Sequence, residues 1–184
     1  MPSSPPPSQP TDLDFFTDIP PEFEPTPVHP IRVRSRPMPA GVRIAQHTHG
    51  WAQLAYASRG VLRMTTPGTT WMVPPSRAIW VPPRVTHEVS IVEDAFLRTL
   101  YVDESVVPPG LGECRVVEVS GLLREVIASL DEPALPATRE RLLCVLALDE
   151  MTRSAPLPLA VPMPLSVWCL QQSRCSESVP THAQ

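Results

Sequence analysis

Lysine is absent from this 184-residue chain, and all fifteen of its basic residues are arginine. Acidic residues number nineteen, the formal net charge is −4, and the arginines form no basic cluster. Proteins hold a phosphate backbone through a cationic surface, which this chain lacks. We therefore do not expect this chain to hold a nucleic acid by itself.

Long apolar runs are missing too, since no stretch approaches the roughly 20 residues needed to span a bilayer. The opening residues, MPSSPPP, lack the charged and apolar regions of a signal peptide. Hydrophobic residues still make up 42% of the chain, which is enough for a folded core. These features predict a cytoplasmic protein with one domain of ordinary size and no membrane contact.

Paired cysteines and catalytic motifs are also lacking. The four cysteines share no C-x-x-C spacing, which argues against a disulfide framework or a thiolate zinc site. No nucleophile elbow, phosphate-binding loop or dinucleotide fingerprint is present, so we expect no catalytic residues of these classes. The cysteines are Cys114, Cys144, Cys169 and Cys175.

Proline, in contrast, is abundant, and twelve of the 26 prolines lie in residues 1–40. Residues 1–30 therefore predict a disordered, proline-rich tail. Residues 156–184 show no sustained period and end in polar residues, which predicts a second, poorly ordered tail.

Short β-rich runs punctuated by turn residues fill residues 31–119 and predict a mainly β sandwich or barrel. The expected strands are 31–36, 42–49, 52–57, 61–66, 69–73, 78–81, 86–92, 95–102 and 115–119. Residues 120–155 change to a helical period, with Ser120 as the expected N-cap of one helix and Thr138 as that of a second. The wide apolar stripe of the second helix fits packing on the barrel and helix-to-helix dimerisation equally well.

Three histidines stand where a closed sheet would bring them together. His47 and His49 are two residues apart and so face one side of a strand, and His87 follows in a later strand. With Gln53 beside them as a hydrogen-bond partner, they could hold a divalent transition metal such as Ni, Zn or Fe. The alternative is a set of hydrogen-bonded interior histidines without a metal.

Residues near this cluster suggest a ligand pocket. Ala55 shares a face with Gln53 and leaves room beside it. Arg43 lies on the His47 face if no bulge intervenes, and Trp80 could form a wall. We therefore expect Gln53, Ala55, Arg43 and Trp80 to line the pocket, although a surface arginine and a core tryptophan are equally simple interpretations.

The spacing of these residues resembles the cupin signature. Gln53 stands where cupins place a glutamate, and Arg84 replaces a glycine of the second motif. The positions that fit are Gly41, His47, His49, Gly60, Pro82 and His87.

The segments WAQLAYASRGV and WMVPPSRAIWVPP resemble the N-terminal sensor domain of AraC/XylS-type transcriptional regulators, over residues 30–160. The resemblance implies a cupin-like jelly-roll barrel at 31–119 that senses a small-molecule or metal effector, and a dimer contact at 120–155. About 100 further residues with helix-turn-helix units normally follow in that family. The resemblance therefore implies a truncated regulator that acts as a homodimer, or as a heterodimer with an intact relative. It would reach DNA only through a DNA-binding domain that this chain lacks.

Two other hypotheses remain at this point. A three-histidine cupin could be a metal-dependent enzyme such as a dioxygenase, although Glu88 should face away from His87 and no other acid or base is evident. The chain could also be a non-functional fragment. The sensor hypothesis is favoured, with effector binding shifting the population of dimer arrangements.

Overall fold

The computed structural model describes residues 19–162, and the expected mainly β, cupin-like fold is confirmed. Its strands form two antiparallel sheets, one ordered β1-β8-β3-β6-β9-β10 and the other β11-β5-β4-β7-β2. The strands are β1 (Ile31–Met38), β2 (Arg43–His47), β3 (Ala52–Arg59), β4 (Leu62–Thr66), β5 (Thr69–Val73), β6 (Arg77–Val81), β7 (His87–Ile91), β8 (Ala95–Val102), β9 (Arg115–Glu118), β10 (Pro156–Leu157) and β11 (Ala160–Pro162).

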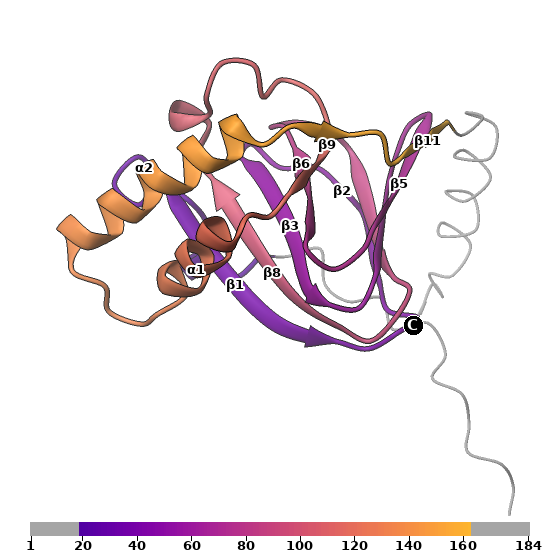
Figure 1. Ribbon diagram of the computed structural model, residues 1–184, viewed down its shortest axis with the longest axis horizontal. Coiled ribbons are helices and arrows are strands. Elements are labelled where there is room, and N and C mark those ends of the chain that lie inside the picture. Colours follow the sequence, from indigo (N-terminus) through magenta and orange to yellow (C-terminus); the bar gives the residue numbers. More distant parts are fainter. Residues whose placement is uncertain (1–18, 163–184) are drawn as a thin grey trace, which may run out of the picture.

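Two helices lie against the outer face of the six-stranded sheet (Figure 1). Helix α1 (Gly121–Leu130) begins after Ser120, whose hydroxyl accepts a hydrogen bond from the Leu123 N–H at 2.9 Å, as predicted. Helix α2 (Ala137–Arg153) begins after Pro136, so the N-cap predicted at Thr138 is wrong. Pro136 has an extended backbone, with φ −58° and ψ 134°, and the helix therefore starts one residue before Thr138.

The two faces of the six-stranded sheet build two separate cores. On β3, Leu54 and Tyr56 pack with the helices, whereas Ala55 and Ala57 pack against the five-stranded sheet. This alternation follows from the period of two along a strand. The odd-numbered residues of β3, including Gln53, therefore face the space between the sheets.

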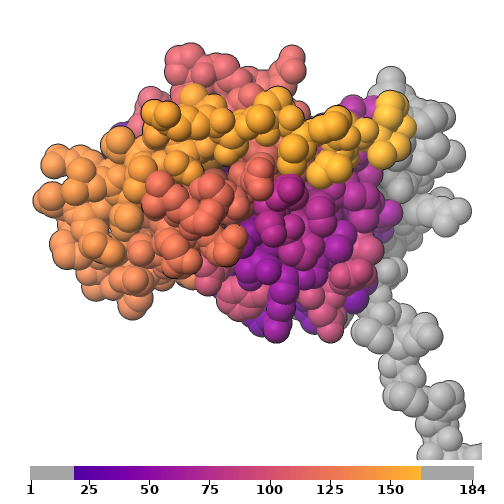
Figure 2. All heavy atoms as spheres, viewed as in Figure 1, coloured from indigo at the N-terminus to yellow at the C-terminus, as the bar shows by residue number. Residues whose placement is uncertain are grey.

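Short regular elements occur in segments that were expected to be irregular. The 3₁₀-helix η1 (Pro21–Phe23) places the Phe23 ring 5.4 Å from the Arg34 guanidinium, and a second, η2 (Glu104–Val106), follows β8. After α2 the chain runs extended along one side of the molecule (Figure 2), where β10 pairs with β9 and β11 with β5. An edge strand offers unpaired backbone groups, which explains the pairing of residues 156–162. Residues 1–18 and 163–184 of the two expected tails lie outside the described residues.

Cys114 and Cys144 are free thiols. Burial raises the pKa of each to about 11, so both remain protonated near neutral pH. Cys169 and Cys175 lie outside the described residues. Within residues 19–162, neither helix is long and apolar enough to cross a bilayer.

Gly60, between β3 and β4, makes a close backbone contact that only glycine allows. Its φ is +77°, and an added Cβ would lie 2.3 Å from the Asp94 carbonyl oxygen. We expect Gly60→Ala to lower the free energy of unfolding by about 2 kcal/mol, measured by urea denaturation. Gly41→Ala is the matched control, because Gly41 has φ +84° but open space around its Cβ position. Equal losses in the two variants would contradict the close approach.

Candidate metal and effector site

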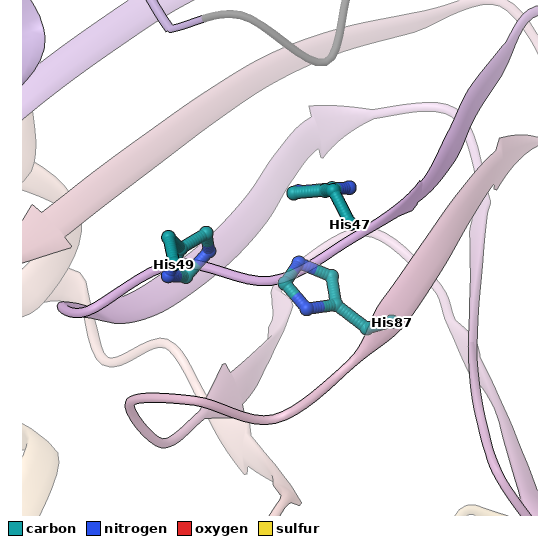
Figure 3. A group of neighbouring side chains, drawn as sticks. All are labelled: His47, His49 and His87. Carbon is teal, nitrogen blue, oxygen red and sulfur yellow. The ribbon is translucent and has the colours of Figure 1, made fainter.

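The three histidines meet at one end of the barrel. His47 ends β2 and pairs in register with His87, the first residue of β7, while His49 lies in the loop after β2. Their rings point toward one another (Figure 3), and their potential ligand atoms all lie within 4.8 Å of one another. The ring centroids of His47 and His87 are 4.3 Å apart, and those of His49 and His87 are 5.1 Å apart. The predicted convergence is therefore present.

Hydrogen bonds fix the same tautomer in all three rings. Each Nδ1 lies within hydrogen-bond distance of a backbone carbonyl two residues away, and a carbonyl oxygen can only accept. Each Nδ1 therefore carries the proton, which leaves a lone pair on each Nε2. The acceptors for His47, His49 and His87 are the carbonyls of Ala45, Trp51 and Val85, at 2.8, 2.7 and 2.9 Å.

The Nε2 atom of His87 is buried and has no hydrogen-bond partner among the described residues. An orphaned polar atom of this kind costs free energy in the folded state unless a ligand satisfies it. Metal-binding histidines in proteins show the same pattern, with one nitrogen held by a carbonyl and the other free for the metal. The donor set thus fits a transition metal ion.

Burial keeps the three rings neutral. Desolvation lowers the pKa of His87 to about 3, and the nearby His47 contributes further. Desolvation also lowers the pKa of His47 and of His49, against the opposing effect of their carbonyl hydrogen bonds. Neutral imidazole is the form that coordinates metals, so all three residues are ready to bind near neutral pH.

Gln53 contacts the cluster from β3. Its Oε1 lies 3.1 Å from the Nε2 of His49. A neutral His49 that donates from Nδ1 has no proton on Nε2, so the Gln53 amide must turn over to donate to that nitrogen, or give way to a metal ion. The glutamine is therefore next to the ligand atoms, as predicted, and adds no negative charge.

The prediction that Arg43 lines the pocket is wrong. A bulge between Ile44 and His47 shifts the register of β2 against β7, so both of these residues face the interior. Arg43 consequently lies on the outer face, where it donates to the Glu88 carboxylate at 2.8 Å. Glu88 points away from His87, as expected.

Trp80 does not line the pocket either. It belongs to the core beneath the helices, and its Nε1 donates to the Leu111 carbonyl at 2.8 Å. Its neighbours Ile79 and Val81 face the interior instead. Gln53 and Ala55 do line a small cavity between the two sheets. Two of the four expected pocket residues are therefore in the predicted place.

Two hollows meet at the histidines. An inner chamber of about 20 Å³ lies between the sheets, and an open vestibule of about 440 Å³ lies outside it; Ile19 and His47 border both. The vestibule is further bounded by Pro21, Glu24, Thr48, His49 and Trp51. The N-terminal segment before β1 therefore forms part of the site.

A family model described as the AraC-like ligand binding domain matches residues 29–154. This chain belongs to that family. The HTH-type transcriptional regulator NimR of Escherichia coli (strain K12) is 34% identical over 122 residues, which is 64% of this chain and 44% of NimR. The chain therefore spans less than half the length of this relative. Family membership confirms the resemblance to AraC-type sensor domains.

Solved structures show weaker likeness to this AraC-like domain. A cupin superfamily protein from Desulfitobacterium hafniense is 11% identical, with 40% of this chain and 68% of that chain covered and a TM-score of 0.39. KdgF from Halomonas sp. is 18% identical over 40% and 69% of the two chains, with a TM-score of 0.38. The family assignment rests on the sequence matches alone.

Several chamber residues of this AraC-like domain escaped the sequence reasoning. Arg34 and Arg36 reach the chamber from β1, and Thr99 and Tyr101 reach it from β8. A signal existed in the segment IRVRSR, where arginines occupy every second position opposite Ile31 and Val33. Alternating arginines are typical of a solvent-exposed face, but in the fold Arg34 and Arg36 are turned toward the barrel interior.

Proposed function

We propose that residues 31–119 sense a small-molecule effector together with a divalent transition metal, and that residues 120–155 form the dimer contact of an AraC-type transcriptional regulator. The observation that carries the metal part is the set of three neutral imidazoles with unprotonated Nε2 atoms, of which that of His87 is buried without a partner among the described residues. We infer a cytoplasmic, non-catalytic role, since NimR is a transcriptional regulator.

Nickel or zinc suits this donor set best. Imidazole nitrogen binds both, and the general affinity order places both above iron(II). Three protein ligands leave a coordination position to which an effector could attach. When bound, the ion would supply a positive charge for an effector to contact, while His47, His49 and His87 hold it in place.

A physical connection runs from the pocket to α2. His29, just before β1, contacts the Glu140 carboxylate of α2 through Nδ1 at 2.9 Å, and Arg32 lies 3.9 Å from the same carboxylate. Strand β1 also supplies Arg34 and Arg36 to the chamber. Movement of β1 on effector binding would therefore be transmitted to α2, which is the element we assign to the dimer.

Helix α2 has an apolar outer face that its own barrel does not cover. Cys144, Ala147 and Met151 are buried against the sheet, whereas Leu142 and Val145 are 64% and 62% exposed. The two exposed residues are three positions apart and so share one face of the helix. A second copy of the chain would bury this face.

The double substitution Leu142→Asp/Val145→Asp is expected to weaken dimerisation at least about tenfold, because it places charges in an apolar contact. Sedimentation velocity across a concentration series measures the effect. Val92→Asp is the matched control, since Val92 is 45% exposed in a turn far from α2 in sequence. A double variant that dimerises as tightly as the control would show that this face is not the contact.

The same measurement tests the sensing role. With metal-free protein, addition of Ni²⁺ or Zn²⁺ should change the dimer dissociation constant. A metal ion that binds one arrangement of the barrel and helices more tightly than the other increases the population of that arrangement. An unchanged constant at saturating metal would contradict metal-dependent dimer control. Metal-dependent consumption of oxygen would instead favour the dioxygenase alternative.

A further inference from the structure

Two arginines facing the barrel interior have no acidic partner in the part of the chain that the structure describes. Arg34 and Arg36 line the inner chamber, and within residues 19–162 no carboxylate forms a salt bridge with either. Among the described residues, Arg34 contacts two neutral groups, the Phe23 ring at 5.4 Å and the side chain of Tyr101. A guanidinium stays charged in proteins, so the chamber contains two uncompensated positive charges.

The proximity of these charges is unfavourable without an anion. Burial lowers the pKa of Arg36, and the positive charge of Arg34 lowers it further. Both effects mean that the charged form of Arg36 is destabilised where it stands. A bound anion would relieve the repulsion and accept hydrogen bonds from both guanidinium groups.

The remaining walls of the chamber are neutral. Tyr101 is buried, which raises the pKa of its phenol and keeps the hydroxyl available for hydrogen bonding. Thr99 adds a second hydroxyl beside Arg34, its register partner. The facing wall, from the five-stranded sheet, is apolar and consists of Ile44 and Val89, and Ala55 and Leu97 add apolar surface on the same sheet as the arginines. A ligand that fits therefore has a charged end and an apolar body.

We propose that the chamber binds the carboxylate group of a small amphipathic acid through Arg34 and Arg36, with the apolar part of that acid against Ile44 and Val89 on the facing sheet. This inference rests on the proposed sensing function and names the chemical class of its effector. The chamber of about 20 Å³ holds about one water molecule. An acid of this kind needs more room than that, and Ile19, which borders both the chamber and the vestibule, is the side chain whose displacement would join the two spaces.

An inorganic oxyanion fits these walls less well. Sulfate and phosphate present oxygen atoms in every direction, and some of these would face the apolar wall without hydrogen-bond donors. A carboxylate presents two oxygens on one side only, which matches a planar guanidinium. The asymmetry of the chamber thus favours an organic acid.

Isothermal titration of metal-free protein with butyrate and with butyramide tests the proposal. The two probes have nearly the same shape and differ in charge, so butyrate should bind and butyramide should not. Arg36→Gln should weaken butyrate binding about tenfold or more. Arg124→Gln, on the exposed face of α1, is the control and should leave binding unchanged. Equal binding of both probes, or of butyrate to Arg36→Gln and wild type, would overturn the proposal.

Sulfate forms the third arm of the titration. Binding as tight as that of butyrate, and equally sensitive to Arg36→Gln, would overturn the assignment to organic acids. The stability of unliganded Arg36→Gln should be equal to or above that of the wild type, because the substitution removes a like-charge contact. A variant that is strongly destabilised would instead indicate that Arg36 has a structural partner, and would overturn the claim of an uncompensated charge.

Failure of this inference can be told apart from failure of the proposed metal-sensing function. Arg36→Gln leaves His47, His49 and His87 intact, so its affinity for Ni²⁺ should match that of the wild type. Butyrate binding without any metal binding would refute the metal part and support the carboxylate site. Metal binding without butyrate binding would refute the carboxylate site alone.

Discussion

Replacement of His47 by glutamine is expected to weaken the binding of Ni²⁺ or Zn²⁺ by about 100- to 1,000-fold. Structural zinc sites with four ligands bind with about 10–16 kcal/mol, or roughly 2.5–4 kcal/mol per ligand, which corresponds to that range. His47 suits the test because it is only half-buried, so the variant should fold. Its ring also borders both the chamber and the vestibule.

The measurement is a competition titration against a chromophoric chelator, with protein that carries no polyhistidine tag. His29→Gln is the matched control, because His29 lies outside the cluster and contacts Glu140 instead. Wild type and the control should bind one equivalent of metal with the same affinity. If His47→Gln binds as tightly as the wild type, the three imidazoles do not form the metal site.

The expected strands agree closely with the observed ones because their signal is local. The observed β3, β4 and β5 differ from expectation by no more than two residues at either end. Positive φ at Gly60 and Gly68 explains why turns occur at these glycines. The positions of strands and turns could therefore be predicted from short β-rich runs of sequence and from the turn residues between them.

The side of the sheet that each side chain faces was harder to predict. Arg43 was misplaced because a bulge depends on backbone pairing between β2 and β7, which the period of side chains does not encode. Trp80 was misplaced because β6 is covered on both faces from Ala78 to Val81, so these four residues are all apolar and show no alternation. The histidine cluster was predictable because the spacing of His47, His49 and His87 matches a known motif. The bulge precedes His47 and leaves that spacing unchanged.

Acidification of the metal-free protein is expected to reduce its stability steeply below pH 6.5. The pKa of His87 falls from an ordinary value of 6.5 to about 3 in the folded state, mainly because of burial. Between these values the unfolded chain binds more protons than the folded one. The contribution of the neutral His87 to the free energy of unfolding is therefore complete above pH 6.5 and is lost as the pH falls. His87 alone should account for a loss of about 1.4 kcal/mol per pH unit below pH 6.5, and of about 3 kcal/mol by about pH 4.

Urea denaturation of the metal-free protein from about pH 7 to about pH 4 measures this loss. Other carboxylates also titrate over this range, so the informative quantity is the difference between wild type and His87→Gln. The variant has no buried imidazole at this position, and its free energy of unfolding should fall less steeply with decreasing pH. His29→Gln retains all three buried rings and should follow the wild type. Parallel curves for wild type and His87→Gln would mean that the ring is solvated, and a solvated His87 would not leave its Nε2 buried and available for a metal.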